Sequence, residues 1–135
     1  MGVLVDTAAL ASFERSVIGS GNAVALLPQD GFLSAVSLAE MAVGVELADT
    51  LLRRTQRLAF LQFVRDRLEV IPFGEGEASE YARLYAHLRR NGRMIGQLDL
   101  LIAATALANG HEVMTANVAE FSRVPGLAVR PVPPR

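Results

Sequence analysis

Short hydrophobic runs alternate with longer amphipathic stretches along this chain. The runs are too short for helices, and turn residues, glycine or proline flank most of them, which favours buried strands. The predicted strands are Val3–Val5, residues 32–36 ("FLSAV"), residues 69–73 ("EVIPF"), residues 112–115 ("EVMT") and residues 127–131 ("LAVRP"). Pro72 suits a strand end better than a strand centre because it cannot donate a backbone hydrogen bond.

The stretches between these strands carry apolar residues at close to helical spacing. The predicted helices are Thr7 to about Ser16, a short piece from Val24 to Leu27, Leu38 to about Leu47, Thr50 to Leu68, Glu77 to Arg90, Leu98 to Asn109, and a turn from Asn117 to Phe121. Asn91 and Gly92 are a common exit from a helix. Strands separated by helices predict an α/β fold, with a central, mainly parallel sheet flanked by helices on both faces.

Composition narrows the class of protein. The 135 residues, of which 51% are hydrophobic, predict a single domain over residues 1–135. The chain has no cysteine, no apolar run near the roughly 18 residues that a membrane span needs, and a first segment too short and uncharged for a signal peptide. We therefore expect a cytoplasmic protein with no membrane association.

Charge and residue choice exclude several chemistries. The net charge is −1, and all 13 basic residues are arginine. Without lysine, the chain has no P-loop lysine, no Schiff base and no lysine of the kind that a phospho-accepting receiver domain needs. The two histidines, His87 and His111, are too few and too far apart in sequence for a histidine metal cage.

Acidic and amide side chains follow the predicted strands. Asp6 follows the first strand, Glu40 lies one helical turn after the second, Asp99 opens the most apolar helix, and Asn117 and Glu120 follow "EVMT". The carboxyl ends of parallel strands meet at one edge of a sheet, where ligands bind in such folds. We therefore expect these groups to gather there.

Helix capping is an alternative explanation for each group taken singly. Asp6 or Thr7 could cap the first helix, and Asp99 could cap its own. Ser37–Glu40 ("SLAE") and Asn117–Glu120 ("NVAE") match the capping box. A cap contributes about 1 kcal/mol, however, whereas two carboxylates about 4 Å apart repel by up to ~4 kcal/mol near a protein surface. If Asp6, Glu40 and Asp99 meet, a divalent cation is the natural partner, and their oxygen ligands favour Mg²⁺ or Mn²⁺ over zinc.

Four segments, in order, resemble the successive motifs of PIN-domain proteins, and specifically of the VapC toxins of bacterial toxin–antitoxin pairs. They are "VLVDT", "SAVSLAEMAVGV", "IGQLDLLIAATALANGHEVMTAN" and "EFSRVPGLAV", and the resemblance runs from about Val3 to Val132. It implies a PIN-like fold and a metal-dependent endoribonuclease that hydrolyses tRNA, rRNA or mRNA.

The resemblance also assigns residues. Asp6, Glu40 and Asp99 match the family's first three acids, which makes them the expected catalytic residues and ligands of Mg²⁺ or Mn²⁺. Asn117 falls where many members have an aspartate, so it is expected to be a weaker metal ligand, and the number of ions stays open. Glu120 either supplies the missing charge or lies on the helix surface. Thr115 resembles a hydroxyl that members place beside the acids.

The expected partners also come from the resemblance. They are a VapB-like antitoxin, an RNA substrate and a second copy of the chain, in a homodimer and a larger toxin–antitoxin complex. Two alternatives stay open: a PIN-fold RNA- or protein-binding module with weakened catalysis, for which Asn117 is the support, and a PIN nuclease of RNA processing outside a toxin pair. Arg89, Arg90 and Arg93 cluster at a helix end, where they complement the helix dipole or contact RNA phosphates.

Overall fold

A single parallel sheet organises the computed structural model, which describes residues 1–20 and 27–134. The strands in these residues are β1 (Val3–Val5), β2 (Gly31–Ser34), β3 (Glu69–Ile71), β4 (Glu112–Thr115) and β5 (Val129–Pro131). They lie in the order β3-β2-β1-β4-β5, and each neighbouring pair is parallel. The predicted α/β fold with a mainly parallel sheet is confirmed. The predicted piece from Val24 to Leu27 lies outside the described residues, apart from Leu27.

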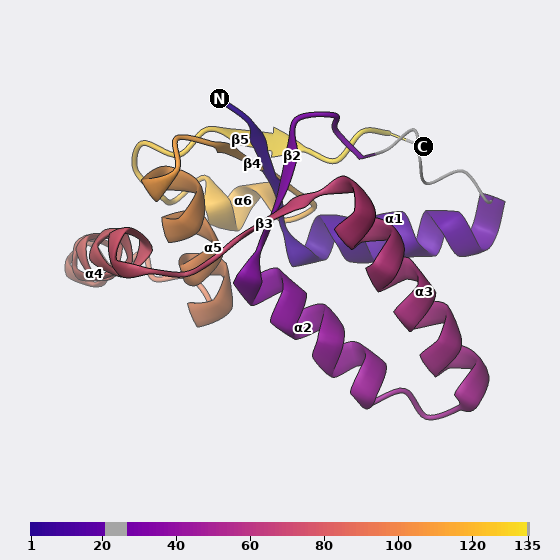
Figure 1. Cartoon of the computed structure of the whole chain (residues 1–135). Helices are drawn as coiled ribbons and strands as arrows, with labels where there is room; N and C mark the ends of the chain where they lie inside the picture. The colour runs from indigo at the N-terminus through magenta and orange to yellow at the C-terminus, as the bar shows by residue number, and fades with distance from the viewer. Residues whose placement is uncertain (21–26, 135) are drawn as a thin grey trace.

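Helices cover both faces of the sheet, as Figure 1 shows. They are α1 (Thr7–Ser20), α2 (Ala35–Glu46), α3 (Leu51–Arg67), α4 (Glu75–Arg90), α5 (Gln97–Ala108) and α6 (Val118–Phe121). In Figure 1, α1 and α3 lie on one side of the strands, and α4, α5 and α6 lie on the other. No helix in the described ranges is long and apolar enough to cross a membrane.

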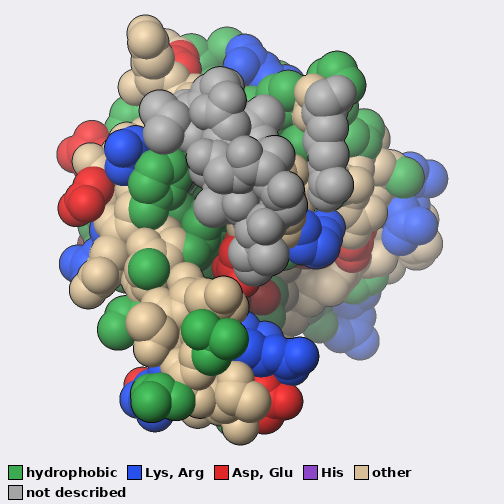
Figure 2. Space-filling view, turned by 90° about the vertical axis from the view of Figure 1, so that its right-hand side faces the viewer, with side chains coloured by type: hydrophobic (Ala, Val, Ile, Leu, Met, Phe, Trp, Pro, Cys, Tyr) green, Lys and Arg blue, Asp and Glu red, His purple; other side chains and the backbone are tan. Residues whose placement is uncertain are grey.

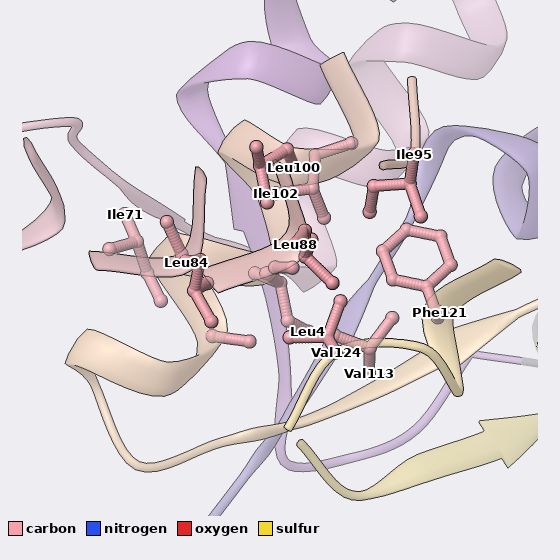
Figure 3. Close-up of a cluster of buried hydrophobic side chains, with 13 residues drawn as sticks. Leu4, Ile71, Leu84, Leu88, Ile95, Leu100, Ile102, Val113, Phe121 and Val124 are labelled. Carbon is pink, nitrogen blue, oxygen red and sulfur yellow. The ribbon is translucent and has the colours of Figure 1, made fainter. Parts of the chain in front are cut away.

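The alternation of side chains along β1 creates two hydrophobic cores. Val3 and Val5 point to the side of α1 and α3, where they join a buried cluster that contains Phe13 and Val64. Leu4 points to the opposite side, into a cluster formed with α4, α5 and α6 (Figure 3). Successive side chains of a strand point to opposite faces, so a wholly apolar strand such as β1 serves both cores.

The boundary between β2 and α2 differs from the prediction. The strand ends at Ser34, and α2 begins at Ala35 because the Ser34 hydroxyl accepts a hydrogen bond of 3.0 Å from the backbone N–H of Val36. The predicted strand to Val36 and the predicted helix start at Leu38 are therefore wrong. Ser37 is a buried residue within α2 rather than its N-cap, so the predicted capping box at Ser37–Glu40 is wrong as well.

Helices α2 and α3 form a hairpin that projects beyond the sheet (Figure 1). Its tip exposes large hydrophobic side chains: Val43 is 54% exposed, Leu47 75%, Leu51 81% and Leu52 68%. In Figure 2 the hairpin lies at the bottom of the view, where hydrophobic side chains are scattered among arginine and acidic ones. We call Val43, Leu47, Leu51 and Leu52 the hairpin patch.

Candidate active site

Asp6 occupies the centre of the carboxyl edge of the sheet. It follows β1 directly, its backbone N–H donates to the carbonyl of Met114 on β4 at 3.0 Å, and it is fully buried. Its Oδ1 accepts a hydrogen bond of 2.8 Å from the N–H of Ala9, and its Oδ2 accepts one of 2.5 Å from the Thr115 hydroxyl. Of the two capping candidates for α1, Asp6 and Thr7, it is Asp6 that accepts from the helix backbone, and Thr115 lies beside this first acid.

Burial nevertheless raises the pKa of Asp6. Desolvation of the charged carboxylate is the largest cause, the hydrogen bonds from Thr115 and Ala9 oppose it, and the negative charge of Glu40 adds to it. The two donors therefore hold the carboxylate in a fixed orientation without fully compensating for its removal from water.

Glu40 is oriented by a pair of hydroxyl groups. The Thr7 hydroxyl donates to Glu40 Oε1 at 2.7 Å, and Thr7 Oγ1 also lies 3.0 Å from the hydroxyl oxygen of Ser37. Because a carboxylate only accepts, Thr7 uses its single proton on Glu40 and receives one from Ser37. We did not predict Thr7 and Ser37 as site residues, although each lies within a motif that carries the family resemblance.

Asp99 lies in the first turn of α5 but is not its N-cap. The N-cap is Gly96, so the capping alternative for Asp99 is wrong. The pKa of Asp99 is raised to about 7: desolvation is the largest cause, followed by a hydrogen bond and the charge of Glu120, and then by the charges of Asp6 and Glu40. The negative charges of Glu120, Asp6 and Glu40 thus all act on the Asp99 carboxyl group.

Glu120 belongs to this acidic cluster, although it also lies on the short helix α6. Its Oε1 accepts a hydrogen bond of 2.8 Å from the backbone N–H of Gly96, immediately before α5. This bond is the largest cause of the lowered pKa of Glu120, to which the bonds from Asp99 and Asn117 contribute. The pKa of Asp99 is thus raised and that of Glu120 lowered, as expected when two neighbouring carboxyl groups share a proton.

Asn117 links β4 to Glu120. Its backbone N–H donates to the Thr115 hydroxyl at 2.8 Å, and its side-chain Nδ2 donates to Glu120 Oε2. Asn117 is the N-cap residue of α6 but makes no side-chain capping bond, so the capping box predicted at Asn117–Glu120 is wrong. Its amide side chain serves the acidic cluster instead.

The donor chemistry of the cluster suits a hard divalent cation, since every side-chain ligand it offers is an oxygen. Within the described parts of the chain, no three Asp, Glu or His side chains already converge closely enough to hold an ion. Hydrogen bonds to Thr115, Thr7 and Gly96 engage the carboxylate oxygens of Asp6, Glu40 and Glu120. Shared coordination by Asp6, Glu40 and Asp99 therefore stays a prediction.

Comparison with known proteins identifies the class. The PIN domain model matches residues 3–127, so this chain belongs to the PIN domain family. The chain is 33% identical to "Ribonuclease VapC1" of Rickettsia felis over 135 residues, which cover 96% of this chain and 95% of that protein. It is 35% identical to "Ribonuclease VapC" of Rickettsia bellii over 133 residues, which cover 98% of each chain.

A solved structure agrees in fold over the whole chain. The crystal structure of VapBC2 from Rickettsia felis, bound to a DNA fragment from its promoter, contains a chain that matches with a TM-score of 0.83 and 28% identity. The match covers 98% of this chain and 100% of that one. The predicted PIN-like fold and the resemblance to VapC proteins are confirmed.

Proposed function

We propose that this protein is a divalent-metal-dependent endoribonuclease of the VapC kind, a toxin that a VapB-like antitoxin neutralises. The observation that carries the proposal is the coupled acidic cluster at the carboxyl edge of the sheet, where the charges of Asp6, Glu40 and Glu120 help to raise the pKa of Asp99 to about 7. Strongly shifted carboxyl groups that affect one another are typical of catalytic sites. The ribonuclease names of the two Rickettsia relatives support RNA as the substrate.

Asp6, Glu40 and Asp99 would hold Mg²⁺ or Mn²⁺, with the side-chain oxygen of Asn117 as a weaker ligand and Glu120 as an additional charge. When bound, the ion supplies an acidified water and neutralises the charge that develops on the phosphate. Carboxylates that repel one another without a cation would gain from binding one, since each charge then has an opposite partner.

The neighbouring residues keep the acids in place. Thr115 and Ala9 fix the two oxygens of Asp6, Thr7 fixes one oxygen of Glu40, and the N–H of Gly96 fixes one oxygen of Glu120. Such second-layer hydrogen bonds reduce the reorganisation required when the charged substrate arrives. In the metal-free protein the pKa of Asp99 is raised to about 7, so binding of a cation by this carboxyl group would release its proton.

The hairpin patch and the acids suggest how an antitoxin would bind. Val43, Leu47, Leu51 and Leu52 offer an apolar surface for a helix of the partner. A basic side chain or chain end of that partner would pair with the carboxylates and exclude both RNA and the cation. The VapBC2 chain of similar fold supports this partner. We also propose a homodimer, a larger toxin–antitoxin complex and a cytoplasmic location, where cellular RNA is available.

The decisive assay is cleavage of mixed-sequence RNA with Mg²⁺ or Mn²⁺, and with EDTA, by the wild type and by Asp99→Asn. Cleavage is expected only with the metal and is expected to disappear in Asp99→Asn, while the fold is retained. Asp66→Asn, at an exposed acid on α3, is the matched control and should cut like the wild type. Wild-type cleavage by Asp99→Asn, or full cleavage in EDTA, would refute the proposal.

A second candidate function is an RNA- or protein-binding module with weakened catalysis. Asn117 favours it, because an amide at this position brings no charge for a second ion. In that case the wild type would bind RNA without cutting it, and Asn117→Asp would increase metal-dependent cleavage. A nuclease of RNA processing outside a toxin pair would cut RNA equally well when a VapB-like protein is co-expressed.

A further inference from the structure

A second surface feature lies next to the acids, on the other side of Gly96. A cavity of about 280 Å³ is lined by Tyr81 and Tyr85 of α4, Met94, Ile95, and Gln97 and Leu100 of α5. This volume is near the lower end of the roughly 300–1,000 Å³ of small-molecule sites, which suits one aromatic ring system. Within its walls, Gln97 and the two tyrosine hydroxyls are the side-chain polar groups that could make hydrogen bonds.

The cavity has a rigid floor. Ile95 and Leu100 are 7% and 1% exposed and belong to the same buried cluster as Phe121 (Figure 3). The rings of Tyr81 and Tyr85 lie on α4 with their centroids 6.0 Å apart, and Tyr85 is 39% exposed. An exposed aromatic ring over a packed floor is the arrangement on which an unpaired nucleobase stacks.

Two hydrogen bonds to the backbone of residues 94 and 96 link the wall of the cavity to the segment that carries Glu120. The carbonyl of Met94, a wall residue, accepts a hydrogen bond of 3.1 Å from Arg123 Nη1, and the N–H of Gly96 donates to Glu120. Gly96 faces both Asp99 and Glu120, and the next residue, Gln97, lines the cavity. The cavity and the acidic cluster therefore meet at the start of α5, where Gly96 borders the acids and Gln97 borders the cavity.

Positive charge continues the same surface. Tyr81, Tyr85 and Arg89 follow one another at four-residue spacing and therefore share one face of α4. Arg89 and Arg93 are exposed, and in the described part of the chain neither forms an ion pair. Aromatic rings with arginines beside them can bind single-stranded RNA, because the rings stack on bases and the guanidinium groups pair with phosphates.

We propose that the cavity of Tyr81, Tyr85 and Gln97 receives a base of the RNA next to the bond that is cut, and that Arg89 and Arg93 contact the phosphates of that strand. This inference rests on the proposed ribonuclease function. It assigns to the cavity the recognition of the nucleotide next to the cleaved bond. Tyr85 would stack on the base, and the Gln97 amide, which can both donate and accept, would read its edge.

The first test measures RNA binding without cleavage. The probe is a short fluorescent single-stranded RNA of mixed sequence in EDTA, and the dissociation constant is read by anisotropy. Tyr85→Ala should weaken binding by roughly tenfold, as loss of one stacked base does, whereas Tyr85→Phe should bind like the wild type. Phe73→Ala is the matched control, since Phe73 is 36% exposed but does not line the cavity. Wild-type affinity of Tyr85→Ala, or equal losses in Tyr85→Ala and Phe73→Ala, would overturn the inference.

The second test reads the cleavage positions. Sequencing the 5′ ends of cut RNA should show that Gln97→Ala relaxes the nucleotide preference at one position beside the cut; an unchanged preference would contradict the assignment of Gln97. The competing occupant is a second copy of the chain. If Tyr85→Ala abolishes self-association but leaves the RNA dissociation constant unchanged, the cavity is a contact between copies and not a base site.

The two proposals fail separately. Asp99→Asn should lose cleavage but keep the dependence of RNA binding on Tyr85. If Asp99→Asn cuts RNA normally, the proposed active site is wrong whatever Tyr85→Ala does. If Tyr85→Ala binds and cuts like the wild type while Asp99→Asn is inactive, the base site is wrong and the proposed function stands.

Discussion

Thr7 on α1 and Glu40 on α2 are joined by a hydrogen bond of 2.7 Å from the threonine hydroxyl to Glu40 Oε1. Thr7 directly follows Asp6, so the residue next to the first acid sets the orientation of the second. The bond connects helices from neighbouring strands, β1 and β2. Together with the pairing of β1 and β2, this bond holds the Glu40 carboxylate in place relative to Asp6.

Removing this bond should slow catalysis without unfolding the protein. We expect Thr7→Ala to reduce kcat/KM for RNA cleavage by about 10- to 100-fold, the usual effect of losing a second-layer hydrogen bond at a metal site. Thr7→Ser keeps the hydroxyl and should stay close to the wild type. The account of Thr7 would be wrong if serine and alanine were equally slow, or if alanine had no effect.

Glu120 should control the protonation of Asp99. In Glu120→Gln the amide oxygen can still accept from Gly96, but the negative charge is gone, so the pKa of Asp99 should fall below its value of about 7 in metal-free protein. Carboxyl ¹³C chemical shifts recorded over a pH titration measure this directly. Asp66→Asn, a change of the same charge on α3, should leave the Asp99 titration unmoved. An unchanged pKa of Asp99 in Glu120→Gln would show that Glu120 does not contribute to it.

The contribution of Asp99 to the stability of metal-free protein should fall as pH rises towards neutrality. The pKa of Asp99 is raised from 3.8 to about 7 in the fold. Between these values the folded protein keeps a proton that the unfolded chain releases, so the free energy of unfolding decreases with rising pH and levels off above about pH 7. Because Asp99 is only half-buried, we expect a loss on the order of 1 kcal/mol, or about 4 °C in Tm.

Thermal unfolding of the wild type and of Asp99→Asn at about pH 5 and about pH 8 isolates this contribution. His111 changes stability in the opposite direction, since burial lowers its pKa, and the comparison cancels it because both proteins contain it. The difference in Tm between the two proteins should shift in favour of Asp99→Asn at the higher pH. A difference that is the same at both pH values would contradict the raised pKa.

Gly31 should be sensitive to substitution because of its close neighbours. A Cβ there would lie 2.4 Å from Leu68 Cδ2 and 2.9 Å from the carbonyl oxygen of Pro28. Gly31→Ala should therefore destabilise the protein by about 1–3 kcal/mol, the cost of overpacking, as measured by urea unfolding. Gly76→Ala, where nothing lies within 4 Å, should be neutral or stabilising in α4. Equal effects of the two substitutions would remove the steric explanation.

Periodicity and turn residues predicted the elements but not all of their boundaries. The exit of α4 is as expected, with Asn91 at the C-cap and Gly92 at a φ of +64°. The start of α2 was missed, because the Ser34 hydroxyl ends the strand inside the mostly hydrophobic run of residues 32–36. A cap is a contact of one side chain and leaves no periodic signal.

The sequence motifs predicted the acids of the site but not the hydrogen bonds that hold them. The strand ends and the resemblance indicated Asp6, Glu40 and Asp99, whose charges do act on one another in the fold. The bond from the N–H of Gly96 to Glu120 spans 24 positions in sequence, and a backbone donor carries no signature in residue type. Ser37 was assigned to a capping box from the local pattern alone. Its hydrogen bond to Thr7 depends on tertiary structure, so the sequence did not reveal it.

Titration calorimetry with Mn²⁺ is the most direct test of the claim that the acidic cluster binds a divalent cation. The wild type should bind the ion with measurable heat near neutral pH, and Asp6→Asn and Asp99→Asn should each bind it much more weakly, with Asp66→Asn as the unaffected control. Equal binding by all four proteins, or no binding by the wild type, would contradict the account.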